Sequence, residues 1–475
     1  MLNYCKNNKY LILISFLWII LWASLNSFPA DIYFIKETFS FQISSKNFLI
    51  NLINMMRFYL PVIFSNLLII ILIINNLKTN EKNSKFILLC FALFFTQFLG
   101  LIFSNFENFN LERTFLLLLS FNGLGIIYLG NIFLNDNQFK KVLFINIFFL
   151  ILIAILYLPI IYKDFFNSPF LLLYNTRTWN QLYFDDPIIR VTGLSRVLAL
   201  LTIIFLVRLN EELSKKSLTI ILLVLIFLGT NIWGLQSRLV LFTMSIIIFI
   251  NIIFFSKKRF LKKFFYYSLI SALSLLSFKG IQNSKLYYLE KKKPELVERY
   301  NYDLKNKKNR IEEVISRTTD KEVDDDELIY ITSGRNLIWK KIINSYEYEK
   351  IFGYGPQADR YVILKQDKKD INDSGYMTNS SSAFFYSFIC GGYFGIIIFI
   401  IINFYILKLL YDYLKTRVFN DKNNYSDTLF LLIIFLQIRS VFENSYAVFS
   451  LDFLIMTSCV VLLEKIVKFR KNLEN

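Results

Sequence analysis

The chain has 475 residues, of which 55% are hydrophobic and 19% charged, and its formal net charge is +17. The apolar residues, 51 Phe among them, occur in long uninterrupted runs, which excludes an ordinary soluble enzyme and indicates a chain that folds in lipid. The sequence contains no histidine, so histidine metal ligands, a Ser-His-Asp triad and an imidazole base are excluded.

Apolar runs of roughly 20 residues are long enough to cross a bilayer as helices. Such runs lie near residues 10–26, 59–76, 86–104, 115–134, 142–162, 193–209, 217–235, 239–256, 264–278, 383–405, 428–446 and 447–464. The sixth and ninth runs are short, so the sequence predicts about twelve transmembrane helices, give or take one or two. The expected fold class is an all-α integral membrane protein.

Lysine and arginine predict how these helices are oriented. If the N-terminus is cytoplasmic, the cytoplasmic segments contain most of the basic residues, including the clusters at 257–263 and 465–471. The short loops on the other side contain far fewer, so the positive-inside rule predicts that both termini are cytoplasmic. Most of the positive charge is thereby an orientation signal, and no basic-aromatic pattern suited to nucleic acid occurs.

One connection is much longer than the others and lies on the predicted outer side, between the ninth and tenth runs. Its acidic run Asp324–Glu327 lacks the alternating ligand spacing of a calcium loop and is interpreted as a solvated linker. Further on, Ser333 is expected to cap a helix that Gly353-Tyr354-Gly355-Pro356 ends in a turn. The predicted parts are nine transmembrane helices in 1–278, a large periplasmic loop in 279–382 and three helices in 383–475.

Several arginines lie at the predicted outer boundary, whereas the inner side is rich in lysine. They are Arg190, Arg196, Arg238, Arg335 and Arg439. A guanidinium group is always charged and binds a diphosphate or carboxylate through two parallel hydrogen bonds, so these residues are candidates for anion binding.

Each of these arginines also has a structural interpretation. Those before residue 240 could anchor the helices at the lipid headgroups, and Arg335 could be a solvated helix residue. Arg439 and Glu443 are four residues apart, hence on one face of a helix, and could neutralise each other.

The motifs follow a characteristic order along the chain. The segment Arg190-Val191-Thr192-Gly193-Leu194-Ser195-Arg196 opens a helix, and Ser237-Arg238 lies between two adjacent spans. The large outer loop then contains Ser333-Gly334-Arg335, Trp339 and Gly353–Pro356, and the next span opens with Gly391-Gly392-Tyr393-Phe394-Gly395. From the Arg190 region to the C-terminus, this order resembles the O-antigen ligase and O-antigen polymerase superfamily of multi-pass bacterial glycosyltransferases.

The resemblance implies a GT-C-like enzyme of the bacterial inner membrane that acts on undecaprenyl-diphosphate-linked oligosaccharides at the periplasmic face. A polymerase transfers the growing glycan to a new lipid-linked repeat, and a ligase transfers it to lipid A core. The ligase pattern has a histidine-asparagine pair just ahead of the tenth span, where this sequence reads Thr378-Asn379-Ser380-Ser381-Ser382. The missing histidine therefore favours the polymerase, with membrane lipid and a chain-length regulator as further expected partners.

A lipid-diphosphate donor already carries a good leaving group, so catalysis mainly needs charge stabilisation and placement of an acceptor hydroxyl. Arg238 and Arg335 are expected to grip the diphosphate as catalytic residues. The further diphosphate-binding candidates are Arg190, Arg196 and Arg439. Glu443 is the first candidate for orienting or deprotonating the hydroxyl, and Asp359 is a weaker one. The sequence offers no metal cluster and no cofactor motif, so neither is expected.

Two other classes remain as alternatives to a polymerase. A ligase-type transferase would use the same donor, and a flippase for lipid-linked oligosaccharides would suit about twelve spans. Secondary transporters are usually built from repeated halves, however, and this chain has no internal repeat and one asymmetrically placed long loop. A scaffold or chain-length regulator is disfavoured because residues 279–382 contain no sustained heptads.

Overall fold

The structure is a computed structural model of the 475-residue chain. It describes residues 32–35, 40–43, 84–104, 110–168, 173, 191–210, 214–255, 260–298, 335–359, 380–417, 424–447 and 450–474. The predicted spans at 10–26 and 59–76, Arg190, Ser333 and the acidic run Asp324–Glu327 lie outside these residues.

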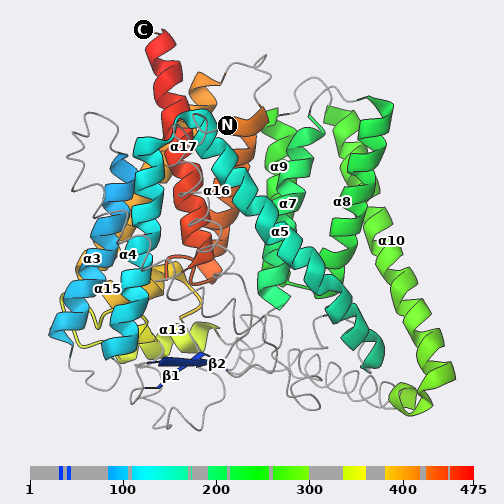
Figure 1. Ribbon diagram of the computed structural model, residues 1–475, viewed down its shortest axis with the longest axis horizontal. Coiled ribbons are helices and arrows are strands. Elements are labelled where there is room, and N and C mark those ends of the chain that lie inside the picture. The colour runs from blue at the N-terminus through cyan, green and yellow to red at the C-terminus, as the bar shows by residue number, and fades with distance from the viewer. Residues whose placement is uncertain are drawn as a thin grey trace, which may run out of the picture. The chain divides into compact units, whose positions relative to one another are not determined.

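The described part is nearly all helical (Figure 1). Its long helices are α3 Lys85–Phe103, α4 Asn110–Phe133, α5 Asp136–Asn167, α7 Val191–Arg208, α8 Lys215–Leu235, α9 Arg238–Phe255, α10 Phe260–Lys292, α15 Ala383–Thr416, α16 Asn424–Phe442 and α17 Leu451–Glu474. A shorter helix, α13, covers Arg335–Asn344. Strand β1 (Ile32–Ile35) pairs antiparallel with β2 (Ser40–Ile43).

Six helices of the described part are long and apolar enough to cross a membrane, namely α3, α8, α9, α10, α15 and α16. Helix α4 contains a shorter apolar segment, Leu116–Ile132. Large apolar side chains are exposed on these helices, as the 64% exposure of Phe249 and the 68% exposure of Phe404 illustrate, and such a surface is suited to lipid. The chain is therefore a multi-pass membrane protein, and the total of about twelve spans remains a prediction.

The chain forms two compact units. Unit 1 comprises residues 1–26, 30–150 and 338–475, and unit 2 comprises 27–29 and 151–337. Within unit 1, α15 packs against α3, α16 and α17, and α17 also contacts α3 and α4 (Figure 1). Within unit 2, α8 and α9 each contact α7 and α10.

Helix α10 continues past residue 278, where the ninth span was expected to end, and stops at Lys292. The first part of the predicted outer loop is therefore helical. The helix ends two residues before Pro294, because a proline disfavours helical geometry in the residue that precedes it.

A buried ion-pair cluster joins three helix ends of unit 1. Asp427, at the start of α16, accepts hydrogen bonds from Nε and Nη2 of Arg417 at 2.9 and 2.8 Å and from the hydroxyl of Tyr413 on α15. The guanidinium of Arg470 on α17 lies 5.3 Å from the centre of the Tyr413 ring. The end of α15, the start of α16 and the basic part of α17 thus lie together at one end of unit 1. That this end faces the cytoplasm remains a prediction.

Replacing Asp427 by alanine is expected to lower the free energy of unfolding by roughly 2–3 kcal/mol, because Arg417 would lose its bidentate partner. The side chain of Arg417 is only 12% exposed. The midpoint of thermal unfolding of the detergent-solubilised protein measures the effect. Asp136→Ala is the control, since the Asp136 carboxylate is 72% exposed and its pair with Lys465 should be worth about 0–1 kcal/mol. Equal shifts of the unfolding midpoint for Asp427→Ala and Asp136→Ala would contradict a stabilising role of the buried Asp427–Arg417 pair.

Candidate functional site

Helix α15 is interrupted at Gly392, where the backbone has φ 63° and ψ −154°, a conformation that only glycine adopts readily. Non-helical backbone at membrane depth is tolerated only where other groups satisfy its polar atoms. The amide of Tyr393, just after the break, donates to the carbonyl oxygen of Ile351 at 3.0 Å. The backbone at the break is therefore hydrogen-bonded to the loop that follows α13.

The Gly-Tyr-Gly-Pro segment supplies the other hydrogen bonds at the break. The amides of Tyr354 and Gly355 donate to the carbonyl oxygens of Ile389 and Cys390, each at 2.9 Å. Helix α3 also approaches the loop closely, because a Cβ atom on Gly100 would lie 2.5 Å from the carbonyl oxygen of Phe352. The two glycine motifs of the sequence are thus parts of one packed structure.

Arg113, near the start of α4, holds the same loop. Its side chain is 0% exposed. Its Nε donates to the carbonyl oxygen of Pro356 at 2.8 Å, and its Nη2 donates to that of Tyr354. Arg113 was not among the predicted site residues, although its position just ahead of an apolar run was a signal in the sequence.

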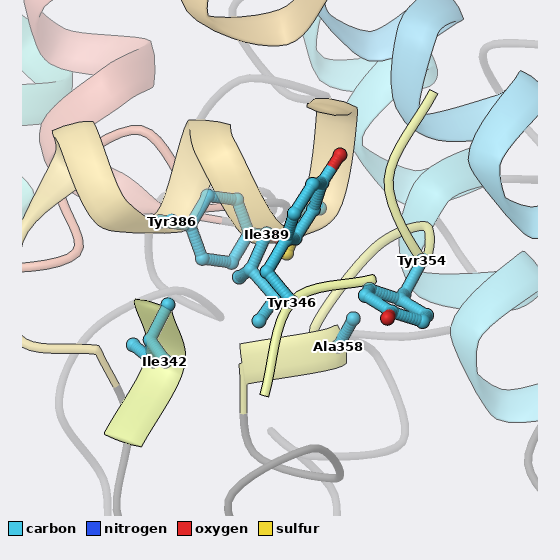
Figure 2. Packing of buried hydrophobic residues seen from close by; sticks show 7 residues of the cluster. Ile342, Tyr346, Tyr354, Ala358, Tyr386 and Ile389 are labelled. Carbon is cyan, nitrogen blue, oxygen red and sulfur yellow. The ribbon is translucent and has the colours of Figure 1, made fainter. Parts of the chain in front are cut away.

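A buried cluster lies beneath the loop, and Figure 2 shows its side chains packed between α13, the loop and the first part of α15. The cluster consists of Ile342, Tyr346, Tyr354, Ala358, Tyr386, Ile389 and Cys390. Burial raises the pKa of Tyr354, so its hydroxyl stays protonated while it accepts a hydrogen bond from the amide of Glu347 at 2.9 Å. The cluster fixes the loop up to Asp359.

Asp359 is the last described residue of the loop, and its side chain is 0% exposed. Its Oδ2 atom accepts two hydrogen bonds of 2.8 Å, one from the amide of Ser380 and one from Nδ2 of Asn444. The residues thus brought together come from the end of the loop, the start of α15 and the connection between α16 and α17.

The Asn444 side chain has a defined orientation. Its Oδ1 accepts hydrogen bonds from the hydroxyl of Ser380 at 2.5 Å and from the amide of Ser382 at 3.2 Å, which turns Nδ2 toward Asp359. The carbonyl oxygen of Ser380 in turn accepts a 2.8 Å hydrogen bond from Nε1 of Trp339 on α13. We call Asp359, Ser380, Asn444 and Trp339 the Asp359 site.

The predicted arginines of unit 2 differ in their surroundings. Arg238 is the first residue of α9, follows a tight turn at Gln236 (φ 48°), and is exposed. Its side chain has no hydrogen-bond or ion-pair partner among the described residues. Arg196 lies in the second turn of α7 and is half-buried, and Arg335 is the first residue of α13 and is also half-buried.

Arg439 has a different partner from the one its spacing suggested. It is 3% exposed, and its Nε lies 3.5 Å from Oδ2 of Asp452 in the first turn of α17. Helix α16 ends at Phe442, so Glu443 lies beyond the helix and not on the face that carries Arg439. The expected pairing of Arg439 with Glu443 along one helix face was therefore wrong, and Arg439 joins α16 to α17.

The predicted site residues fall into both units. Arg196, Arg238 and Arg335 belong to unit 2, whereas Arg439 and Glu443 belong to unit 1. Their convergence on one diphosphate therefore remains a prediction. Among the residues that the structure describes, no group of three or more His, Cys, Asp or Glu side chains could hold a metal ion.

Several long apolar helices, one of them interrupted at Gly392 next to a buried polar cluster, are features of a multi-pass membrane protein. Residues 221–400 match the model of the O-antigen ligase family. This match supports the O-antigen polymerase and ligase superfamily for this segment, and members of the superfamily are glycosyltransferase-like enzymes of polysaccharide assembly with lipid-linked glycan substrates. No curated protein and no solved structure matches the chain.

The matched segment contains Arg238, Arg335, Asp359, the loop Gly353–Pro356 and the α15 break, and it leaves out Arg196, Arg439 and Glu443. The superfamily predicted from the order of the motifs is confirmed.

Proposed function

We propose that the protein is a polysaccharide polymerase that joins undecaprenyl-diphosphate-linked oligosaccharide repeats at the periplasmic face of the bacterial inner membrane. The observation that carries the proposal is a domain of the O-antigen ligase family in a chain without histidine. The ligases of this superfamily place a histidine ahead of the span that corresponds to α15. Here the same place reads Thr378-Asn379-Ser380-Ser381-Ser382, without a histidine, which supports a polymerase.

The environment of Arg238 supports its role in binding the donor diphosphate. An exposed guanidinium with no ion-pair partner among the described residues is available to a ligand. Its position on the first turn of α9 adds the favourable field of a helix N-terminus for an anion. We assign Arg238 and Arg335 to stabilising the departing diphosphate, and Arg190 and Arg196 to completing its binding site. Arg439 is the least favoured of the predicted arginines, because Asp452 already neutralises it.

A ligase-type transferase and a flippase for the same lipid-linked repeats are the alternative functions. The length of the glycan, the lipid that carries it and the membrane face at which it accumulates, compared with and without this chain, separate the three. Loss of a polymerase leaves glycans of a single repeat, whereas loss of a ligase leaves long glycan on its lipid carrier. Loss of a flippase leaves repeats at the inner face of the membrane. Unchanged long glycans in the deletion strain would rule out the polymerase.

Replacing Arg238 or Arg335 by lysine is expected to reduce long glycan chains at least about 100-fold and to leave the single-repeat product. An ammonium group keeps the charge but cannot make the two parallel hydrogen bonds of a guanidinium. Electrophoresis of surface glycans from complemented deletion strains measures the effect. Arg208→Lys is the control, since Arg208 is exposed in the last turn of α7, at the predicted cytoplasmic side. Normal chain length from both test variants would contradict the diphosphate clamp.

A further inference from the structure

The two carboxylate oxygens of Asp359 have different surroundings. Oδ2 accepts two hydrogen bonds, whereas Oδ1 is buried and has no hydrogen-bond partner among the described residues. A buried acceptor that remains unsatisfied costs free energy, and such groups often have a catalytic or ligand-binding role. Within the part of the chain that the structure describes, Oδ1 is therefore an acceptor without a donor, whereas Oδ2 is satisfied.

Asp359 also differs from the other buried aspartates of unit 1. Asp427 pairs with Arg417, and Asp452 pairs with Arg439, so an arginine neutralises each of these carboxylates. Within the described residues Asp359 has only neutral donors, an amide and a backbone N–H. Unlike the other two carboxylates, that of Asp359 is therefore not held in an ion pair with a guanidinium within the described residues.

The direction of Oδ1 is determined by the rest of the Asp359 site. The hydroxyl of Ser380 and the amide of Ser382 orient Asn444, and Trp339 holds the Ser380 backbone. The indole ring of Trp339 in turn stacks on Phe385 of α15, with ring centres 5.0 Å apart and an interplanar angle of 18°. Catalytic side chains depend on this kind of support, because a small displacement of the reacting atom costs much of the rate.

We propose that Asp359 is the catalytic base of the glycosyl transfer, with Asn444, Ser380 and Trp339 as positioning residues. This inference rests on the proposed polymerase function. The hydroxyl oxygen of the acceptor sugar forms a bond to the anomeric carbon of the donor glycan. The bond from that carbon to the diphosphate oxygen breaks, and the lipid diphosphate leaves with the electron pair. The hydroxyl proton passes to Oδ1 of Asp359 and then to water.

The variant Asp359→Asn tests this assignment. An asparagine keeps an acceptor oxygen at the Oδ2 position for Ser380 and Asn444 and replaces only Oδ1 by an NH2 group. The full-length protein is purified and supplied with lipid-linked repeats extracted from the deletion strain. We expect polymer formation to fall at least about 100-fold, with an unchanged midpoint of thermal unfolding. Asp136→Asn, at the exposed end of α5, controls for the loss of an acid.

The outcomes separate this inference from the proposed function. If both the wild type and Asp359→Asn form polymer, Asp359 is not the catalytic base, whereas the proposed polymerase function stands. Failure of the wild type to extend the extracted repeats would overturn both. If Asp359→Asn lowers the unfolding midpoint, Asp359→Glu and Asp359→Gln replace it, because their side chains have the same length and shape. Polymer formation by Asp359→Glu but not by Asp359→Gln supports Asp359 as the base. Equal polymer formation by the two variants contradicts this role.

A double-mutant cycle tests the positioning role of Asn444. Asn444→Ala is expected to lower kcat about tenfold with KM unchanged, and to cause no further loss when Asp359 is already asparagine. If Asn444 had only a structural role, the double variant would show the kcat losses of both single variants combined. Additive losses would remove Asn444 from the positioning residues.

Discussion

Replacing Gly392 by alanine is expected to lower the free energy of unfolding by roughly 4–5 kcal/mol. The backbone of Gly392 has a conformation that is strained for any residue with a Cβ atom. That atom would also lie 2.1 Å from the carbonyl oxygen of Ile351 and 2.4 Å from the amide nitrogen of Gly353. Both neighbours are backbone atoms, so the clash cannot be relieved by a change of rotamer. The loop must separate from α15, and the hydrogen bonds at the break are lost.

Helix α4 offers a matched control for Gly392→Ala. A Cβ atom on Gly125 would meet nothing within 4 Å, so Gly125→Ala should be neutral or stabilise the helix by about 0.5–1 kcal/mol. The midpoint of thermal unfolding in detergent and the amount of protein in the membrane measure both variants. If Gly392→Ala behaved like Gly125→Ala, the interruption of α15 would be refuted.

Replacing Arg113 by alanine is expected to have an effect of similar size, roughly 4 kcal/mol. The carbonyl oxygens of Tyr354 and Pro356 would lose their donors in a buried place, and the missing side chain would leave a cavity. Arg113→Lys should recover only part of the loss, because one ammonium group lacks the forked donors of a guanidinium.

The same unfolding measurement, together with limited proteolysis of the outer loop, reports the effect of Arg113→Ala. Lys415→Ala serves as the control, since Lys415 is exposed near the end of α15. Because Arg113 holds the loop that ends at Asp359, loss of polymer formation should accompany the loss of stability. A stable but inactive Arg113→Ala protein would show that Arg113 acts by another route than holding this loop.

The transmembrane helices of the described part could be predicted well because lipid demands long apolar runs. The run at 86–104 corresponds to α3, and that at 217–235 corresponds to α8, each within two residues. The extension of α10 beyond residue 278 could not be predicted from apolar runs, because hydropathy indicates where a segment leaves the lipid and not where its helix ends.

The candidate site was only partly predictable. The motifs Gly353–Pro356 and Gly391–Gly395 were recognised, but their mutual hydrogen bonds join segments that are far apart in the sequence. The hydrogen bond between Asp359 and Asn444 spans 85 residues, which explains why Asp359 was a weaker candidate than Glu443 and Asn444 was overlooked. The spacing rule for Arg439 failed because it assumed that α16 continues through Glu443.

The interruption of α15 also determines how much of this helix has to fit within the bilayer. A straight helix of 34 residues would be about 51 Å long, far more than the roughly 30 Å hydrocarbon core. The part of α15 after Gly392 is long enough to span the hydrocarbon core alone. The part before it, Ala383–Gly391, which includes Tyr386 and Ile389, can therefore remain at the membrane boundary. A change that straightened α15 would therefore create a hydrophobic mismatch without altering the hydropathy of the segment.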